Sequence, residues 1–227
     1  MKKLLINSLL LITILISLPI SAQQIGDVID PNFMNRQLWK EENSNIKGSP
    51  FYFDEWYSGE IMTKIGTSYP NMKIKYEAYS DQLFFLSEDN IERALAREKI
   101  NWFQFNDAEG NSYLFKHIPY HGFLQVLYDG DVSLYKKIAK EIRKAPEANG
   151  YNATTKQDEF IEKQIYFVAS SPEATIVPID KRNEYLELFS SNEDKIKKFI
   201  KKNKVKFKED ANIIDLVKFT EQLRSEE

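Results

Sequence analysis

The stretch Met72-Lys73-Ile74-Lys75-Tyr76-Glu77 decides the fold class of this chain. Its apolar and aromatic side chains alternate with charged ones, which is the two-residue period of a strand that buries one face. We therefore expect Ile74 and Tyr76 to face a core and the odd-numbered residues of the stretch to face water.

Segments of the same character lie on both sides of this stretch, and turn signals with glycine, proline or small polar residues separate several of them. Short strands joined by short turns favour antiparallel pairing, so the sequence predicts a curled sheet or a barrel-like roll. The other predicted strands are residues 56–65, 82–86, 100–105, 112–118, 123–128, 162–169 and 175–179.

The segment 132–143 fits two structures, because Leu134, Ile138 and Ile142 share one face in either a helix or a strand. The pair Asp129-Gly130 precedes it directly. Since Asp-Gly is typical of two-residue hairpin turns, we predict that 132–143 is a strand.

From residue 180 onward the apolar residues recur at helical spacing, and three helices are predicted. Ser190 and Glu193 form a capping box for the second helix, and Asp210 can cap the third. The apolar face of the third helix consists of Ile213, Leu216, Val217 and Thr220. The predicted fold is therefore α+β, an antiparallel strand-rich body followed by three C-terminal helices.

The N-terminal residues 1–22 are typical of a signal peptide. Lys2 and Lys3 precede an apolar run of fifteen residues, 4–18, which is shorter than the ~20 residues that a membrane-spanning helix needs. We predict cleavage after Ala22 and export to the periplasm or the cell exterior. No later segment is expected to cross a membrane.

The remaining chain is predicted to have three parts. Residues 23–49 form a loosely ordered lead-in, residues 50–179 form the antiparallel β-rich body, and residues 180–227 form a helical segment packed on the body. The change of apolar period at residue 180 sets the last boundary.

The composition excludes several classes of site. The chain has no cysteine, which rules out disulfides, a cysteine nucleophile, thiolate metal ligands and a lipid anchor on cysteine. The formal charge is −3 and becomes −5 once Lys2 and Lys3 leave with the signal peptide. A mildly acidic chain of this kind indicates no nucleic-acid partner.

An aromatic cluster near the start of the body is the candidate ligand-binding surface. Exposed rings could stack on sugars or form a partner surface, but a β-rich domain without cysteine also needs large side chains in its core. Both interpretations stay open for these residues, which are Phe51, Tyr52, Phe53, Trp56 and Tyr57.

The histidines His117 and His121 are weak candidates for a metal site, because Pro119 interrupts the strand between them and no third ligand is in register. We expect no metal and no cofactor. No Gly-x-Ser-x-Gly motif indicates a serine hydrolase. The adjacent carboxylates Asp54 and Glu55 would point to opposite faces of a strand, which does not suit glycoside hydrolysis. We name no catalytic residue.

Eight lysines lie between Lys195 and Lys208, where they could contact anionic lipid or another polyanion. Acidic residues flank them, and the C-terminal end of a helix also favours positive charge. We expect a solvated helix face. No arginine or interleaved aromatic pattern indicates nucleic-acid binding.

The motif Phe53-Asp54-Glu55-Trp56, with Gly59 three residues further on, resembles the F/Y-D-[DE]-W motif that opens a strand-rich domain in a group of exported Bacteroidota proteins of unknown function. The resemblance implies a cell-envelope setting and a strand over 132–143, and it brings no activity, cofactor or catalytic residue. It continues through Lys75-Tyr76, Asp81-Gln82-Leu83, Leu127-Tyr128-Asp129-Gly130, Tyr135-Lys136-Lys137, Tyr166-Phe167-Val168 and Lys198-Phe199-Ile200-Lys201-Lys202-Asn203.

Three functions remain open. The first is a non-enzymatic envelope protein that binds another protein, a glycan or a lipid. The second is a carrier, which would need an apolar cavity for a lipid or another apolar ligand. The third is a hydrolase, which would need a cleft that joins His117 or His121 to a carboxylate with a displaced pKa.

Overall fold

The structure is a computed structural model that describes residues 25–30, 45–146 and 157–225. The predicted signal peptide, residues 1–22, lies outside these ranges. Within them, no helix has both the length and the apolar character needed to cross a membrane.

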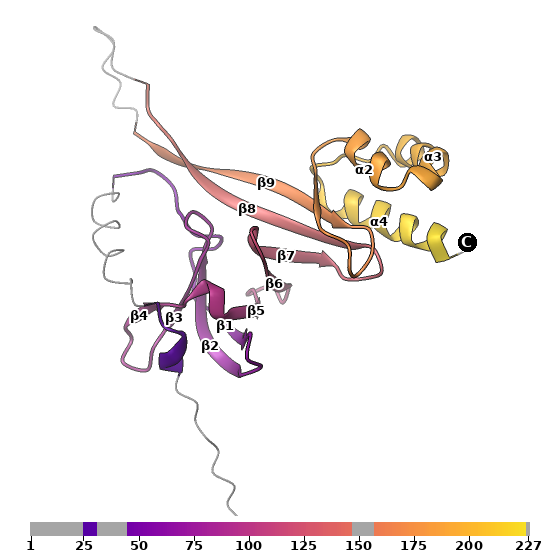
Figure 1. Ribbon diagram of the computed structural model, residues 1–227. Coiled ribbons are helices and arrows are strands. Elements are labelled where there is room, and N and C mark those ends of the chain that lie inside the picture. The colour runs from indigo at the N-terminus through magenta and orange to yellow at the C-terminus, as the bar shows by residue number, and fades with distance from the viewer. Residues whose placement is uncertain (1–24, 31–44, 147–156, 226–227) are drawn as a thin grey trace, which may run out of the picture.

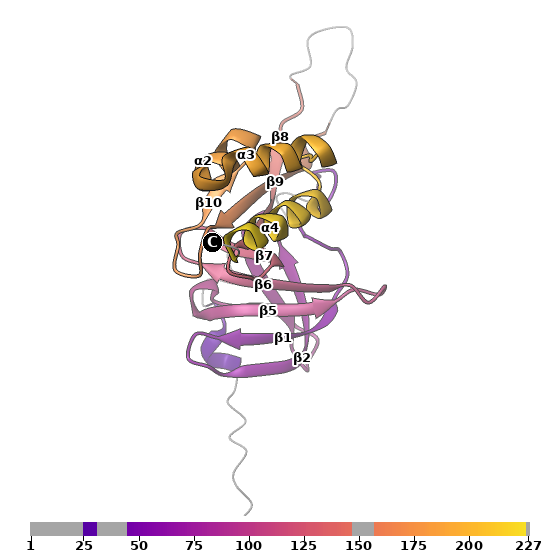
Figure 2. The same ribbon diagram turned by 90° about the vertical axis from the view of Figure 1, so that its right-hand side faces the viewer.

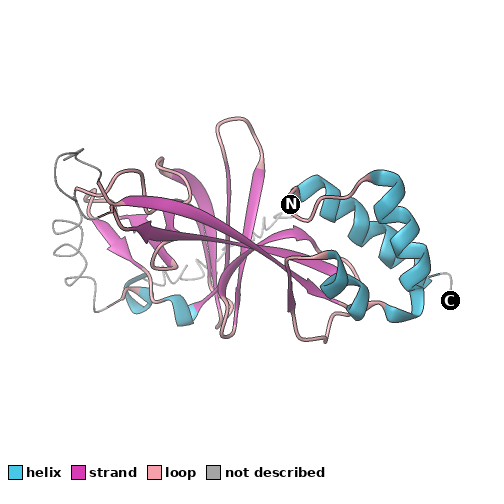
Figure 3. Ribbon diagram, turned by 90° about the horizontal axis from the view of Figure 1, so that it is seen from above, coloured by secondary structure: helices cyan, strands magenta, loops and turns pink. Residues whose placement is uncertain are grey.

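The strands of the described residues form one antiparallel sheet of ten strands, in the order β10-β9-β8-β7-β6-β5-β1-β2-β3-β4. The sheet does not close on itself, so the predicted α+β fold is confirmed with an open sheet in place of a barrel. Figure 3 shows how the sheet twists along its length. The strands are β1 (Tyr57–Thr63), β2 (Ser68–Glu77), β3 (Gln82–Leu86), β4 (Glu92–Ala94), β5 (Ile100–Asn106), β6 (Ser112–Ile118), β7 (Gly122–Tyr128), β8 (Ser133–Arg143), β9 (Glu159–Ala169) and β10 (Val177–Ile179).

Residues 132–143 are confirmed as a strand. β8 pairs with β9 over eleven residues, and this long hairpin crosses the molecule from the helices to the opposite side (Figure 1). The sequence missed one strand, β4, because only three residues, two of them charged, pair with β3.

The stretch that decided the fold class behaves as expected on its apolar side. Ile74 and Tyr76 are 1% and 3% exposed. On the other side Lys73 is exposed, but Glu77 is buried, contrary to the expectation that odd-numbered residues face water. The Ser80 hydroxyl donates a hydrogen bond to the Glu77 carboxylate, which compensates part of the cost of burying it.

The two larger hydrophobic cores of the described residues lie at opposite ends of the sheet, and a smaller cluster contains Leu124, Tyr135, Phe167 and Ala169. The first, which we call the aromatic core, lies on one face of β1–β7 and contains Ile61, Ile74, Tyr76, Phe103, Phe105, Phe115 and Phe123. The second, which we call the helix core, lies between β7–β10 and the helices and contains Leu134, Tyr166, Val168, Tyr185, Ile196, Leu216 and Val217. Figure 2 shows the helices above the strands, next to β7–β9.

The three predicted helices are α2 (Arg182–Leu188), α3 (Glu193–Asn203) and α4 (Asp210–Ser225). The predicted apolar face of α4 is buried, from Ile213 to Thr220. The predicted capping box of α3 is wrong. Ser190 lies in a 3-10 helix, η3 (Ser190–Asn192), and α3 begins only at Glu193.

Part of the lead-in is held in place. The 3-10 helix η1 (Ile25–Val28) places Val28 in the aromatic core with 5% exposure. The backbone of Ala96 donates a hydrogen bond to the Val28 carbonyl at 2.7 Å, next to the edge strand β4. The start of the lead-in therefore covers an edge that would otherwise offer free pairing groups.

A buried carboxylate, Asp81, joins distant parts of the sheet. Its Oδ1 accepts hydrogen bonds from the Tyr76 hydroxyl at 2.6 Å and the Phe123 backbone N–H at 3.2 Å. Lys137 Nζ lies 2.9 Å from Oδ1, and Arg97 donates to Oδ2 at 2.9 Å. Asp81 thereby connects β2, β7, β8 and the 3-10 helix η2 (Arg97–Lys99).

Only glycine fits beside this carboxylate. Gly122 has a φ of 74°, and a Cβ built on it would lie 1.7 Å from Asp81 Oδ2. A larger residue would clash with the carboxylate and would also strain the backbone of the turn between β6 and β7.

Candidate functional site

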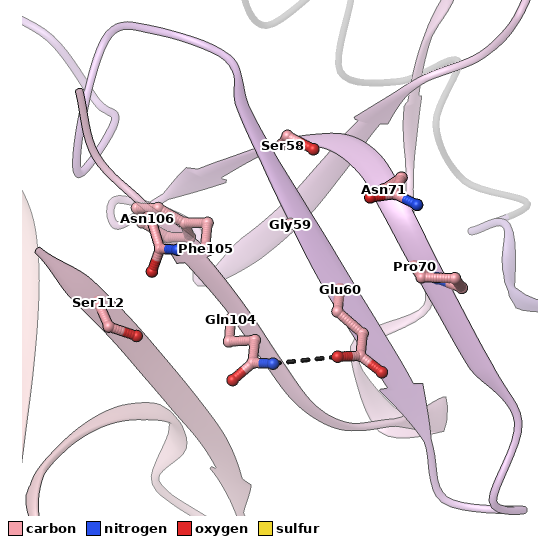
Figure 4. Close-up of a pocket in the computed structure, with 9 residues that line it drawn as sticks. All are labelled: Ser58, Gly59, Glu60, Pro70, Asn71, Gln104, Phe105, Asn106 and Ser112. Carbon is pink, nitrogen blue, oxygen red and sulfur yellow. Dashed lines mark hydrogen bonds between the residues drawn. The ribbon is translucent and has the colours of Figure 1, made fainter. Parts of the chain in front are cut away.

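A polar pocket lies on the outer face of β1, β2, β5 and β6, opposite the aromatic core. It has a volume of about 550 Å³. Figure 4 shows its side chains projecting from these strands. The lining consists of Ser58, Gly59, Glu60, Pro70, Asn71, Gln104, Phe105, Asn106 and Ser112.

A β-bulge in β2 shapes one wall of the pocket. Between the pairs Gly59–Met72 and Ile61–Tyr69, β1 advances by two residues and β2 by three, so β2 carries one extra residue. Asn71 adopts a φ of 57°, in the left-handed region that asparagine tolerates. Pro70 lies next to Asn71 in the bulge. Proline has no backbone N–H to donate, and a bulge is one of the places in a sheet where this donor is not required.

Gly59 allows the strands to approach at the floor of the pocket. A Cβ at this position would lie 2.4 Å from the Gln104 carbonyl oxygen and 2.5 Å from the Ile74 Cδ1 atom. Neither contact is possible for a real side chain, so glycine is required here for steric reasons alone.

Glu60 is the charged residue of the lining and is held by two hydrogen bonds. Its Oε2 accepts from Gln104 Nε2 at 3.0 Å, and its Oε1 accepts from the Ser68 hydroxyl at 2.6 Å. The amide and the carboxylate are therefore fixed on neighbouring strands before any ligand arrives, which lowers the entropic cost of binding.

Four further side chains offer free hydrogen-bonding groups around this pair. Among the described residues, no partner hydrogen-bonds with their side chains, and all four are exposed. Hydroxyl and amide groups both donate and accept, so the wall suits an uncharged ligand with many polar groups. These residues are Ser58, Asn71, Asn106 and Ser112.

The structure divides the predicted aromatic cluster. The Tyr52 ring packs edge-on against Phe115 at 5.4 Å. The Tyr57 ring stacks on Phe105 at 5.1 Å. The Phe53 ring packs edge-on against both Tyr52 and Tyr57. These three rings line the aromatic core and are only partly exposed.

The Tyr52 hydroxyl donates a hydrogen bond to Gln125 Oε1 at 3.1 Å, so its polar end has a partner inside the fold. Burial raises the pKa of this hydroxyl, with a smaller contribution from Tyr113. Tyr52 therefore stays protonated and acts as a hydrogen-bond donor.

Phe51 and Trp56 lie apart from the other three rings, around a lysine. Lys75 Nζ is 4.0 Å from the centre of the Phe51 ring and 5.9 Å from that of Trp56. This is cation–π geometry. None of the five rings lines the polar pocket.

The structure places the two histidines against aromatic rings, and no described carboxylate is left free beside His117. His117 Nδ1 is buried without a hydrogen-bond partner in the structure, and its ring packs against Phe123. Burial lowers the pKa of His117, and the charges of Lys64 and Arg97 lower it further. Its nearby carboxylate, Asp81, is already bound by two cations.

His121 lies in the turn after β6, where its ring packs on Phe167 at 5.0 Å and its carbonyl accepts a hydrogen bond from Lys137. In the part of the chain that the structure describes, no three histidine, aspartate or glutamate side chains are placed to share a metal ion.

Comparison of the chain with family models, with curated proteins and with solved structures found no match.

The polar residues of the pocket were missed in the sequence because each of them is an ordinary side chain of an exposed strand face. One signal was present. Proline and asparagine side by side, Pro70-Asn71, at the start of an alternating strand indicate a bulge, and bulges often shape sites. The predicted strand began at Met72 and so excluded them.

Proposed function

We propose that this chain is an exported cell-envelope protein that acts by binding and not by catalysis. In this proposal it uses the polar pocket of β1, β2, β5 and β6, and its ligand is an uncharged, hydroxyl-rich molecule with the chemistry of a glycan. Its membership of the exported Bacteroidota group is part of the same proposal.

The pocket carries the proposal. Its volume of about 550 Å³ lies in the range of small-molecule sites. Four side chains with free hydrogen-bonding groups surround the fixed Glu60–Gln104 pair. The lining holds no lysine or arginine to attract an anion, and its mainly polar surface does not suit an apolar ligand.

The rival functions have less support. A carrier needs an apolar cavity, whereas the rings of Phe103, Phe115 and Phe123 fill the aromatic core at centroid distances of 4.7 and 5.0 Å. The hydrolase considered above needs His117 or His121 joined to a free carboxylate, whereas Asp81, the carboxylate near His117, accepts hydrogen bonds from Tyr76 and Arg97.

Titration with neutral oligosaccharides, followed by two-dimensional NMR, tests the proposal. The probes are maltotriose and N,N′-diacetylchitobiose, with tri-galacturonate as an anionic comparison. We expect shift changes confined to the pocket strands with a neutral probe. Asn106→Ala and Asn71→Gly should each weaken binding about fivefold, the equivalent of one hydrogen bond. Glycine at position 71 keeps the left-handed backbone.

Asn101→Ala is the matched control, because Asn101 is an exposed asparagine of β5 outside the pocket. It should leave binding unchanged. If neither neutral probe binds, or if the shifts cluster away from β1, β2, β5 and β6, the pocket does not have the proposed function.

A further inference from the structure

The end of the molecule formed by α3 carries a concentration of positive charge that the rest of the chain lacks. Residues 193–210 contain eight lysines and four acids, a formal charge of +4. Since the whole chain has a charge of −3, the remainder carries −7. The charge is therefore strongly separated along an acidic protein.

The fold directs these lysines outward. α3 buries Ile196 and Ile200 in the helix core, and Phe199 stacks on Phe219 of α4 with 4.2 Å between ring centroids. The opposite side of the helix carries lysines. Lys195, Lys198 and Lys202 recur at the spacing of one helical face, and all three are exposed.

Few of these charges are neutralised locally. Lys197 pairs with Glu193 and Lys206 pairs with Glu209, both along the chain. Among the described residues, the other six lysines have no ion pair. They are Lys195, Lys198, Lys201, Lys202, Lys204 and Lys208.

Helix electrostatics explain only part of this pattern. Lys201 and Lys202 lie in the last turn of α3, where the helix dipole favours positive charge. Lys195 lies in the first turn, where the dipole opposes positive charge, and Lys198 lies at the centre of the helix, where the dipole has little effect. The dipole therefore favours neither lysine, whereas a negatively charged surface attracts both.

We propose that this lysine face, defined as Lys195, Lys198, Lys201, Lys202, Lys204 and Lys208, docks the protein on an anionic lipid surface. Figure 1 shows α3 at the end of the molecule away from β1–β5, so the helix can approach a membrane without hindrance from the sheet. The lysines are compact point charges without arginine or exposed stacking rings between them, which suits lipid phosphates better than nucleic acid.

The contact is peripheral and electrostatic. Because the apolar face of α3 is already buried in the helix core, the helix has no apolar surface to insert among acyl chains. Binding should therefore depend on lipid charge and weaken with salt. It does not depend on the polar pocket, which lies on β1, β2, β5 and β6.

Vesicle co-sedimentation tests the docking. The chain starts at Gln23 in all samples, because residues 1–22 would bind vesicles by themselves and every described element lies after them. The vesicles contain phosphatidylglycerol with phosphatidylethanolamine, or phosphatidylcholine alone. We expect binding only to the first, and loss of binding at high sodium chloride.

The triple variant Lys195→Gln, Lys198→Gln, Lys202→Gln should lower partitioning roughly 100-fold, at about fivefold for each lysine near an anionic surface. The matched control removes three exposed lysines from the other end of the protein, Lys47→Gln, Lys64→Gln, Lys73→Gln. It should bind as well as the parent. Circular dichroism checks that both variants are folded.

Three results would overturn the docking proposal. One is equal binding to phosphatidylcholine, which would mean that charge is not the cause. Another is an equal loss in both triple variants, which would mean that only the total charge matters. The third is binding to heparin or RNA without binding to anionic vesicles, which would assign the lysine face to another polyanion.

Discussion

Replacing Asp81 tests whether one buried carboxylate holds distant strands together. Its side chain is 12% exposed, and that of its partner Lys137 is 16% exposed. Asp81→Ala leaves the Tyr76 hydroxyl without its acceptor and leaves the Lys137 ammonium with the His121 carbonyl but no counter-charge. Breaking a buried ion pair costs about 3–5 kcal/mol of unfolding free energy. Arg97 adds little to this loss, because its side chain is 46% exposed and can be solvated by water.

For a domain of this size, a loss of that magnitude lowers the Tm by roughly 6–20 °C. Urea unfolding, monitored by tryptophan fluorescence, measures the free energy of unfolding. Asp81→Asn should cost less, about 2–3 kcal/mol, because its amide oxygen can still accept from Tyr76. Asparagine also tolerates the φ of 57° at this position.

A double-mutant cycle separates the ion pair from other effects of the substitution. When Lys137→Met has already removed the ammonium, Asp81→Asn should cost at least about 1 kcal/mol less than in the parent. The reasoning is refuted if Asp81→Ala costs less than about 1 kcal/mol, or if Lys137→Met leaves the cost of Asp81→Asn unchanged.

Two further substitutions test other contacts. Gly59→Ala should destabilise the protein by about 1–3 kcal/mol in urea unfolding, because its Cβ would overlap the Gln104 carbonyl; a neutral effect would contradict the close approach of β1 and β5. Glu221→Gln should lower stability at neutral pH. The Tyr128 hydroxyl and the Val132 N–H bind this carboxylate and lower its pKa from about 4.5, so its contribution is lost as the pH falls through the lowered value. Parent and Glu221→Gln should therefore converge in acid, and a gap independent of pH would contradict this.

The strands could be predicted because each strand of the aromatic core buries one face. The alternation of apolar and polar residues around Ile74 and Tyr76 indicates directly which face is buried. The β8 assignment depended on Asp129-Gly130, since a stripe of apolar residues fits a helix as well. β4 could not be found, because its three residues pair with β3 only after the sheet has formed.

The candidate site was harder to predict than the fold. Sequence proximity drew attention to the aromatic cluster from Phe51 to Tyr57, but Tyr52, Phe53 and Tyr57 pack onto the aromatic core. The pocket instead combines side chains from four strands, and Glu60 meets Gln104 only through the pairing of β1 with β5. No local pattern contains that pairing.

The sequence by itself determined the fold class and the positive charge of the α3 segment, because apolar period and charge are properties of neighbouring residues. Only the tertiary structure decided that the sheet stays open and that Asp81 forms an ion pair with Lys137 of a distant strand. The same holds for the bulge at Asn71, which shapes the pocket. These features depend on strand register and on contacts between residues far apart in the chain, and each of those is fixed only when the whole sheet assembles.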